Sequence, residues 1–134
     1  MFHEDEEFTP RAMLKAKRIK FFDYCFYYYV YNDNSITKKK DKSKNISDIY
    51  KISDDLEKLY NTIDDKKAKS LLNDRIVYIR LLAFGMQNKY SPQYAFPKTK
   101  IIRKSVKLKN KIKTLLYCIS PKLYFKLLKL RHGE

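Results

Sequence analysis

The sequence predicts a mainly α-helical protein with a small β element, from three observations. Apolar residues recur every three or four positions over residues 46–86 and again over 102–130, which is the period of an amphipathic helix. A run at residues 19–31 consists largely of residues that favour strands. A Ser or Thr followed by Pro, a common helix start, precedes two of the expected helices, at Thr9-Pro10 and at Ser120-Pro121. We therefore expect a short helix, a β-hairpin or edge strand pair, and a bundle of about four amphipathic helices.

The first helix is expected over residues 10–17. Thr9 is a good N-cap residue. Pro10 follows it, at the position where a helix needs no backbone donor and where the fixed φ of proline is already helical. Met13 and Leu14 would then face the core.

The aromatic run IKFFDYCFYYYVY, residues 19–31, predicts two short strands, one before Asp23 and one after Tyr24. Successive side chains of a strand point to opposite faces. One face would carry Phe26, Tyr28 and Val30, and the other would carry Tyr27, Tyr29 and Tyr31. We expect this element to be poorly supported, because an unpaired strand edge invites association.

Residues 32–45 are polar, with Asn and Asp turn signals, and predict a loop. The helical period then extends from Ile46 to Met86, interrupted at Asp64 and Asp65. This pattern predicts two amphipathic helices that pack as an antiparallel pair.

Two further helices are expected after a proline-containing linker at residues 88–100. One spans 102–119 with Ile112, Leu115 and Ile119 on its apolar face, and the other begins at Ser120-Pro121. In the last helix Lys122, Lys126 and Lys129 lie opposite leucines and a phenylalanine. This pattern is typical of helices that lie on a membrane or dock on a partner helix, and equally of surface helices that pack on the preceding pair. The three lysines are candidate membrane or anion contacts.

The charge is strongly asymmetric. The net charge is +15, and from Lys98 to the end there are twelve Lys and Arg and a single acid, Glu134. Such an excess predicts anionic partners. Nucleic acid is the less favoured partner, because no glycine-aromatic RNA-binding pattern and no zinc-finger spacing occurs. A small basic helical module that binds anionic membrane or nucleic acid is therefore one hypothesis.

Four consecutive acids, Glu4 to Glu7, open this basic chain. One interpretation is electrostatic, since acids at a helix N-terminus interact favourably with the helix dipole by about 0.3 to 1 kcal/mol each. The other is that a carboxylate at a strand-to-helix junction projects into a cleft as a general base. Residue chemistry alone leaves both interpretations open.

The segment HEDEEFTP, residues 3–10, is followed by RAMLKAKRIK, by the tyrosine run and by NSIT at residues 34–37. In this order the segments resemble the C-terminal part of the catalytic domain of bacterial family 2 glycosyltransferases of the GT-A type. The resemblance implies inverting transfer of a sugar from a nucleotide sugar to a cell-surface glycan or lipid-linked acceptor. It also implies a cytoplasmic protein, peripheral on the inner face of the cytoplasmic membrane.

The resemblance implies roles for individual residues. Asp5, in the Glu-Asp motif of the family, would be the catalytic base that takes the proton of the acceptor hydroxyl, and Glu4 would orient Asp5 or the acceptor. His3 would lie near the metal and the diphosphate. Three further residues would lie near the acceptor or the phosphates: Arg11, Asn34 and Ser35.

The sequence also departs from the family pattern. Val30 stands where related sequences often have an Arg, and the absence of Trp excludes the Gln-x-x-Arg-Trp motif of processive synthases. The family's nucleotide-binding half, with the Asp-x-Asp motif that holds Mg²⁺ or Mn²⁺, is not in this sequence. We therefore expect no bound cofactor and no transferase activity from this chain alone. The predicted organisation is residues 1–37 as the catalytic-domain remnant, 38–45 as a basic loop and 46–134 as a helical region.

Overall fold

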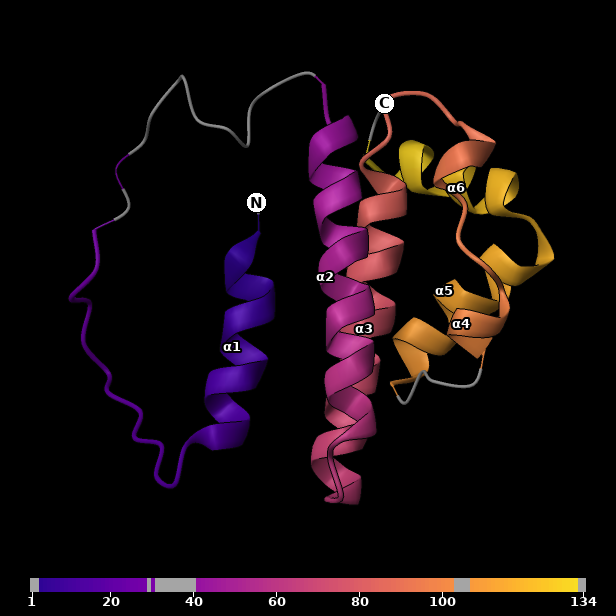
Figure 1. Ribbon diagram of the computed structural model, residues 1–134. Coiled ribbons are helices and arrows are strands. Elements are labelled where there is room, and N and C mark those ends of the chain that lie inside the picture. The colour runs from indigo at the N-terminus through magenta and orange to yellow at the C-terminus, as the bar shows by residue number, and fades with distance from the viewer. Residues whose placement is uncertain (1–2, 29, 31–40, 103–106, 133–134) are drawn as a thin grey trace.

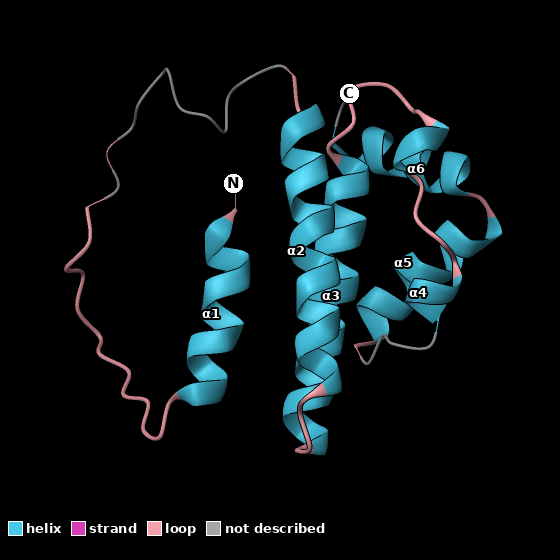
Figure 2. Cartoon of the chain, viewed as in Figure 1, coloured by secondary structure: helices cyan, strands magenta, loops and turns pink. Residues whose placement is uncertain are grey.

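The computed structural model describes residues 3–28, 30, 41–102 and 107–132, and this part of the chain is helical without strands (Figures 1 and 2). The α-helices are α1 (Glu4–Lys15), α2 (Ser43–Asn61), α3 (Lys66–Gly85), α4 (Thr99–Ile102), α5 (Leu108–Ile119) and α6 (Pro121–His132). A short 3-10 turn, η2 (Pro92–Tyr94), lies between α3 and α4. The mainly α-helical prediction is confirmed.

Helices α2 and α3 form the predicted antiparallel pair and lie side by side in Figure 1. Asp65 caps α3, because its carboxylate accepts the Ala68 backbone N–H at 2.5 Å. The apolar faces of both helices meet in a first core, which consists mainly of buried isoleucines and leucines. Its members include Ile46, Ile49, Ile52, Leu56, Ile76 and Ile79.

A buried arginine joins α2 to α3 from within this pair. Arg80 donates from Nε to Ser53 Oγ at 2.9 Å and from Nη2 to Asp54 and Glu57 at 2.8 and 2.9 Å. Lys100 of α4 also reaches Asp54, at 3.0 Å. A charge this deeply buried needs such partners. Because Lys100 and Arg80 share Asp54, the network also ties α4 to the central pair.

A second, aromatic core lies between α3 and the α5–α6 pair. Phe84 of α3 contacts Tyr117 of α5 edge-on, with ring centroids 5.0 Å apart, and Tyr117 stacks on Phe96 at 4.5 Å. Tyr124 and Phe125 of α6 complete the cluster. Helix α3 is therefore buried on two sides, one toward α2 and the other toward α5 and α6.

Helix α1 corrects the predicted start of the first helix. It begins at Glu4, and Pro10 lies inside it. The first turn of the helix carries four acids, which interact favourably with the positive end of the helix dipole. Glu6 of this turn also forms an ion pair with Arg75 of α3. The predicted burial of Met13 and Leu14 is also wrong, since α1 buries no residue.

The predicted β element is absent from the described residues of the aromatic run. Residues 16–28 and 30 are extended without strand pairing, and they run apart from the helices in Figure 1. A strand needs a neighbour to accept and donate its ladder hydrogen bonds, and no described segment supplies one. Tyr29 and Tyr31 lie outside the described residues.

The helix predicted over residues 102–119 begins later, because α4 ends at Ile102, α5 starts at Leu108, and residues 103–106 lie outside the described part. On the apolar face predicted for this helix, Ile112, Leu115 and Ile119 are exposed. The predicted start of α6 is confirmed, since Ser120 Oγ accepts the Leu123 N–H at 3.2 Å and Pro121 begins the helix.

Candidate functional site

The two predicted catalytic residues, Glu4 and Asp5, lie together in the first turn of α1. Both side chains are exposed. A groove of about 300 Å³ runs between α1 and α3. Its lining is Pro10, Met13, Leu14, Ala68, Leu71, Leu72 and Arg75. Neither Glu4 nor Asp5 lines this groove.

The other two acids of the first turn bind arginines. Glu6 accepts from Arg75 Nε at 2.9 Å, and both of its oxygens contact Arg75 Nη2. Glu7 accepts from Arg11 Nε at 3.1 Å within the same helix. Arg11, predicted near the acceptor or the phosphates, is thus engaged by its own helix. The Glu6 pair fixes α1 on α3, whereas the Glu7 pair lies within α1.

His3 precedes α1 in the left-handed conformation, with φ 64°. Its Nε2 lies 3.3 Å from Asn45 Nδ2, at the start of α2. The described residues contain no group of three or more His, Cys, Asp or Glu side chains placed to hold a metal ion. The predicted site residues Asn34 and Ser35 lie outside the described part of the chain. The residues at the N-terminus therefore do not assemble a metal centre.

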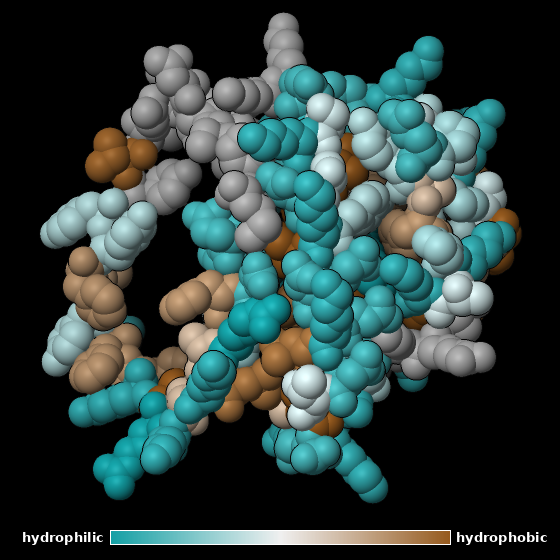
Figure 3. Space-filling view, in the orientation of Figure 1, coloured by the Kyte–Doolittle hydropathy of each residue, from teal (hydrophilic) through white to brown (hydrophobic). Residues whose placement is uncertain are grey.

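A second site is formed by α5 and α6, most of whose leucines and isoleucines are exposed. We call these residues the outward stripe. It consists of Leu108, Ile112, Leu115 and Ile119 of α5 and Leu123, Leu127 and Leu130 of α6. Leu115 and Ile119 are 61% and 72% exposed, and Leu108 is 74% exposed. In Figure 3 hydrophobic atoms reach the surface among hydrophilic ones on the side that holds α5 and α6.

Polar residues hold α5 in this orientation. Asn110 is buried and donates from Nδ2 to the buried carboxylate of Asp74 at 2.8 Å. Tyr117 Oη accepts the Phe96 N–H at 2.9 Å and donates to the Phe96 carbonyl at 3.0 Å. Thr114, one turn from each, is also buried. The face of α5 that contacts the protein is therefore its polar and aromatic face.

Three cations line a groove that α5 and α6 form together and that extends onto α3. Lys109, Lys113 and Arg131 line two cavities of about 430 and 240 Å³, which share Tyr124 and Leu128 on their walls. Residues of α3, Leu82 among them, also line the larger cavity. Burial lowers the pKa of Lys113, and the neighbouring Lys109 and Arg131 charges lower it further. Apolar walls and concentrated positive charge suit a ligand with an anionic head and an apolar body. We call this the α5–α6 groove.

The sequence pointed to this end of the chain but to none of these three cations. Of the predicted contacts, Lys122 and Lys126 are exposed on α6. Lys129 lines the larger cavity, and its Nζ lies 5.6 Å from the centre of the Phe125 ring. The four-residue spacing of Lys109 and Lys113 on one helix was a readable signal.

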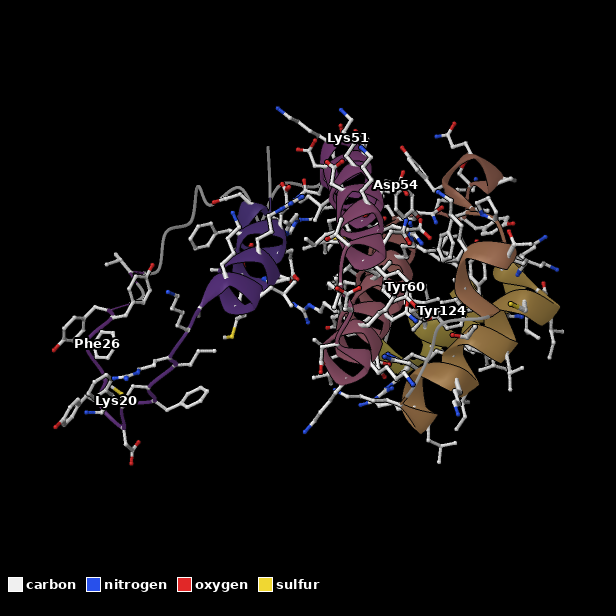
Figure 4. All side chains as sticks on the ribbon, turned by 60° about the horizontal axis from the view of Figure 1, so that its bottom comes forward. Lys20, Phe26, Lys51, Asp54, Tyr60 and Tyr124 are labelled. Atoms are coloured by element: carbon white, nitrogen blue, oxygen red, sulfur yellow. The ribbon has the colours of Figure 1, made fainter. Side chains whose placement is uncertain are left out.

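The aromatic segment at residues 19–28 is the third exposed feature. Phe21 and Tyr28 are 85% and 87% exposed, and Phe22 stacks only on Tyr24 of the same segment, at 6.2 Å. Figure 4 shows Lys20 and Phe26 on this segment, away from the helices, whereas Tyr124 lies among them. These rings contribute nothing to either core.

No family model, curated protein or solved structure matches this chain. Among the described helices none is both long and apolar enough to cross a bilayer.

Proposed function

We propose that this chain is the acceptor-side, C-terminal part of a bacterial family 2 glycosyltransferase. The observation that carries the proposal is the order of segments at residues 3–37: the Glu-Asp motif, a basic helix, the tyrosine run and NSIT. Helix α1 supports it, because Glu4 and Asp5 keep exposed carboxylates in its first turn while Glu6 and Glu7 serve as its ion-pair anchors.

The exposed aromatic segment gives a second, physical support. Transfer of aromatic side chains from water into a protein interior is among the most favourable terms in folding, so a run of exposed rings is costly unless another surface covers it. Residues 21–28 present six such rings, all of them exposed: Phe21, Phe22, Tyr24, Phe26, Tyr27 and Tyr28. In the proposed enzyme a central sheet in the nucleotide-binding half would pair with this segment and cover its rings.

The chemistry assigned to this chain is that of the acceptor. The acceptor hydroxyl oxygen forms a bond to the anomeric carbon, the bond from that carbon to the donor phosphate breaks, and the nucleoside diphosphate leaves. Asp5 takes the hydroxyl proton as the bond forms, and Glu4 holds the acceptor or Asp5 in place. The described residues offer no three-ligand cluster and His3 Nε2 faces an amide nitrogen, so the family's metal does not fit this chain by itself.

The test is to read the DNA upstream of the Met1 codon and to produce the extended protein it encodes. We expect a strand-and-helix domain with an Asp-x-Asp motif, and transfer of labelled sugar from a nucleotide sugar to a lipid-linked or glycan acceptor. Asp5→Asn should reduce that transfer by at least about a hundredfold, the lower end of what general base catalysis contributes.

The matched control is Asp64→Asn, which makes the same change at an exposed carboxylate in the turn between α2 and α3. It should leave transfer unchanged. The proposal is wrong if no such domain is encoded upstream, or if Asp5→Asn and Asp64→Asn transfer sugar equally well.

A further inference from the structure

The outward stripe requires an explanation, because it places apolar surface in water while polar residues of the same helix occupy the interior. Each square ångström of exposed apolar surface costs about 25 cal/mol relative to burial. Rotation of α5 would bury the stripe, but it would break the buried pair of Asn110 and Asp74 and the two hydrogen bonds of Tyr117 to Phe96. The fold therefore holds the stripe outward, as expected where an external apolar surface covers it.

The charge around the outward stripe restricts which kind of external surface can cover it. Every Lys, Arg, Asp or Glu at residues 107–132 is a cation: Lys107, Lys109, Lys111, Lys113, Lys122, Lys126, Lys129 and Arg131. A second copy of this chain would bring two such surfaces together, and their repulsion opposes a dimer. Nucleic acid would neutralise the lysines but leave the leucines and isoleucines in water. A partner must therefore combine negative charge with apolar depth.

An anionic bilayer offers both at one surface, phosphates above and acyl chains below. Lysine side chains suit this boundary, because their stems lie along apolar surface while the ammonium group stays at headgroup level. Helices with Leu and Ile on one side and Lys on the other lie in this interface. The α5–α6 groove adds a defined place for one headgroup, with Lys109, Lys113 and Arg131 beside apolar walls.

We infer that the α5–α6 pair is a docking surface for anionic phospholipid membranes, with the outward stripe in the interface and a lipid phosphate among Lys109, Lys113 and Arg131. No residue of α1 takes part, so this inference is independent of the proposed glycosyltransferase function. Helix α2 would then lie farther from the bilayer, since it packs on α3.

The first test measures retention of the full chain on vesicles. Phosphatidylcholine vesicles containing phosphatidylglycerol should retain the protein, and pure phosphatidylcholine vesicles should not. Since a Lys near an anionic surface contributes about 1 kcal/mol, loss of both charges in Lys109→Gln/Lys113→Gln should weaken binding by about 25-fold. The control Lys66→Gln/Lys67→Gln removes two exposed lysines at the start of α3 and should weaken binding less than twofold.

The second test separates insertion from surface charge attraction. The chain contains no Trp, so a single Trp reports on its own position. In Leu115→Trp the fluorescence emission of the introduced Trp should shift to the blue on anionic vesicles, and brominated lipid should quench it. Met13→Trp, at an exposed apolar position on α1, should do neither.

Two results would overturn the inference. One is equal retention on neutral vesicles, or none on either kind. The other is binding without a blue shift of Leu115→Trp that a polynucleotide competes away, which would assign the basic surface to nucleic acid. Unfolding in urea monitored by circular dichroism should give the same midpoint for all variants, since each substitution is on the surface.

Discussion

Two helix pairs in this molecule carry similar apolar patterns and use them in opposite ways. In α2–α3 the isoleucines and leucines form the core, and Ile52, Leu56 and Ile76 are fully buried. In α5–α6 most isoleucines and leucines of α5 face water, and the pair attaches to α3 through Tyr117, Tyr124 and Phe125. Periodicity therefore identifies which face of a helix is apolar, but not whether the protein itself covers that face.

The sharpest way to break this comparison is to make one substitution in both pairs. Leu56→Ala removes a fully buried side chain from the α2–α3 core and should lower the free energy of unfolding by about 2 to 5 kcal/mol. Leu115→Ala removes the same atoms from the outward stripe and should change it by no more than about 0.5 kcal/mol. Urea unfolding measures both, and a comparable loss in the two variants would show that α5 buries its leucines after all.

The next prediction concerns what holds α5 in place. Asn110→Ala removes the donor that pairs with Asp74 inside the protein and should cost about 1 to 3 kcal/mol, because a buried carboxylate loses a partner. Lys111→Ala changes the neighbouring residue, which is exposed, and should cost much less. Equal unfolding midpoints for the two variants would mean that the polar contact does not fix the orientation of α5.

The aromatic core gives a prediction in alkaline solution. Burial raises the pKa of Tyr124 to about 12, from 10.0 for an ordinary phenol. Between these pH values the unfolded chain releases a proton that the folded chain retains, so stability falls as pH rises through this window, by about 1.4 kcal/mol per pH unit. Below pH 10 this contribution is fully present. Burial likewise raises the pKa of Tyr117 to about 12, so both phenols make the free energy of unfolding fall as the pH rises through this window.

Tyr124→Phe removes one of these phenols and keeps the ring. The free energy of unfolding of this variant should fall less steeply than that of the parent protein between pH 10 and 12. Tyr28→Phe, in the exposed aromatic segment, should follow the parent protein. Parallel profiles for Tyr124→Phe and the parent would contradict the burial of Tyr124.

What the sequence predicted correctly was local. The α2–α3 pair follows from its period, and the start of α6 follows from Ser120-Pro121, because these signals lie within a few residues of the structure they specify. The orientation of α5 depends instead on Asn110 meeting Asp74, 36 positions away, and on Tyr117 meeting Phe96. No local pattern encodes such contacts, so the sequence left open whether the apolar face of α5 packs on the protein or meets another surface.

The candidate site was predictable to a similar extent. The basic C-terminal end was evident from charge alone, whereas the convergence of Lys109 and Lys113 with Arg131 requires the turn between α5 and α6. At the other end, the sequence left open whether the four acids serve a helix N-terminus or catalysis, and they lie in the first turn of α1. Which acid binds which arginine was not predictable, since Arg75 lies 69 positions from Glu6.

The smallest expected effect concerns α1, which buries no residue and is held on the body through Glu6 and Arg75. Glu6→Gln should change global stability by less than about 1 kcal/mol, because exposed ion pairs contribute little. It should nevertheless speed amide hydrogen exchange in α1 and leave α2 and α3 unaffected. Glu7→Gln is the control, since Glu7 pairs with Arg11 inside the same helix and does not reach α3. If both variants sped amide hydrogen exchange in α1 equally, the ion pair between Glu6 and Arg75 would not be what holds α1 on the body.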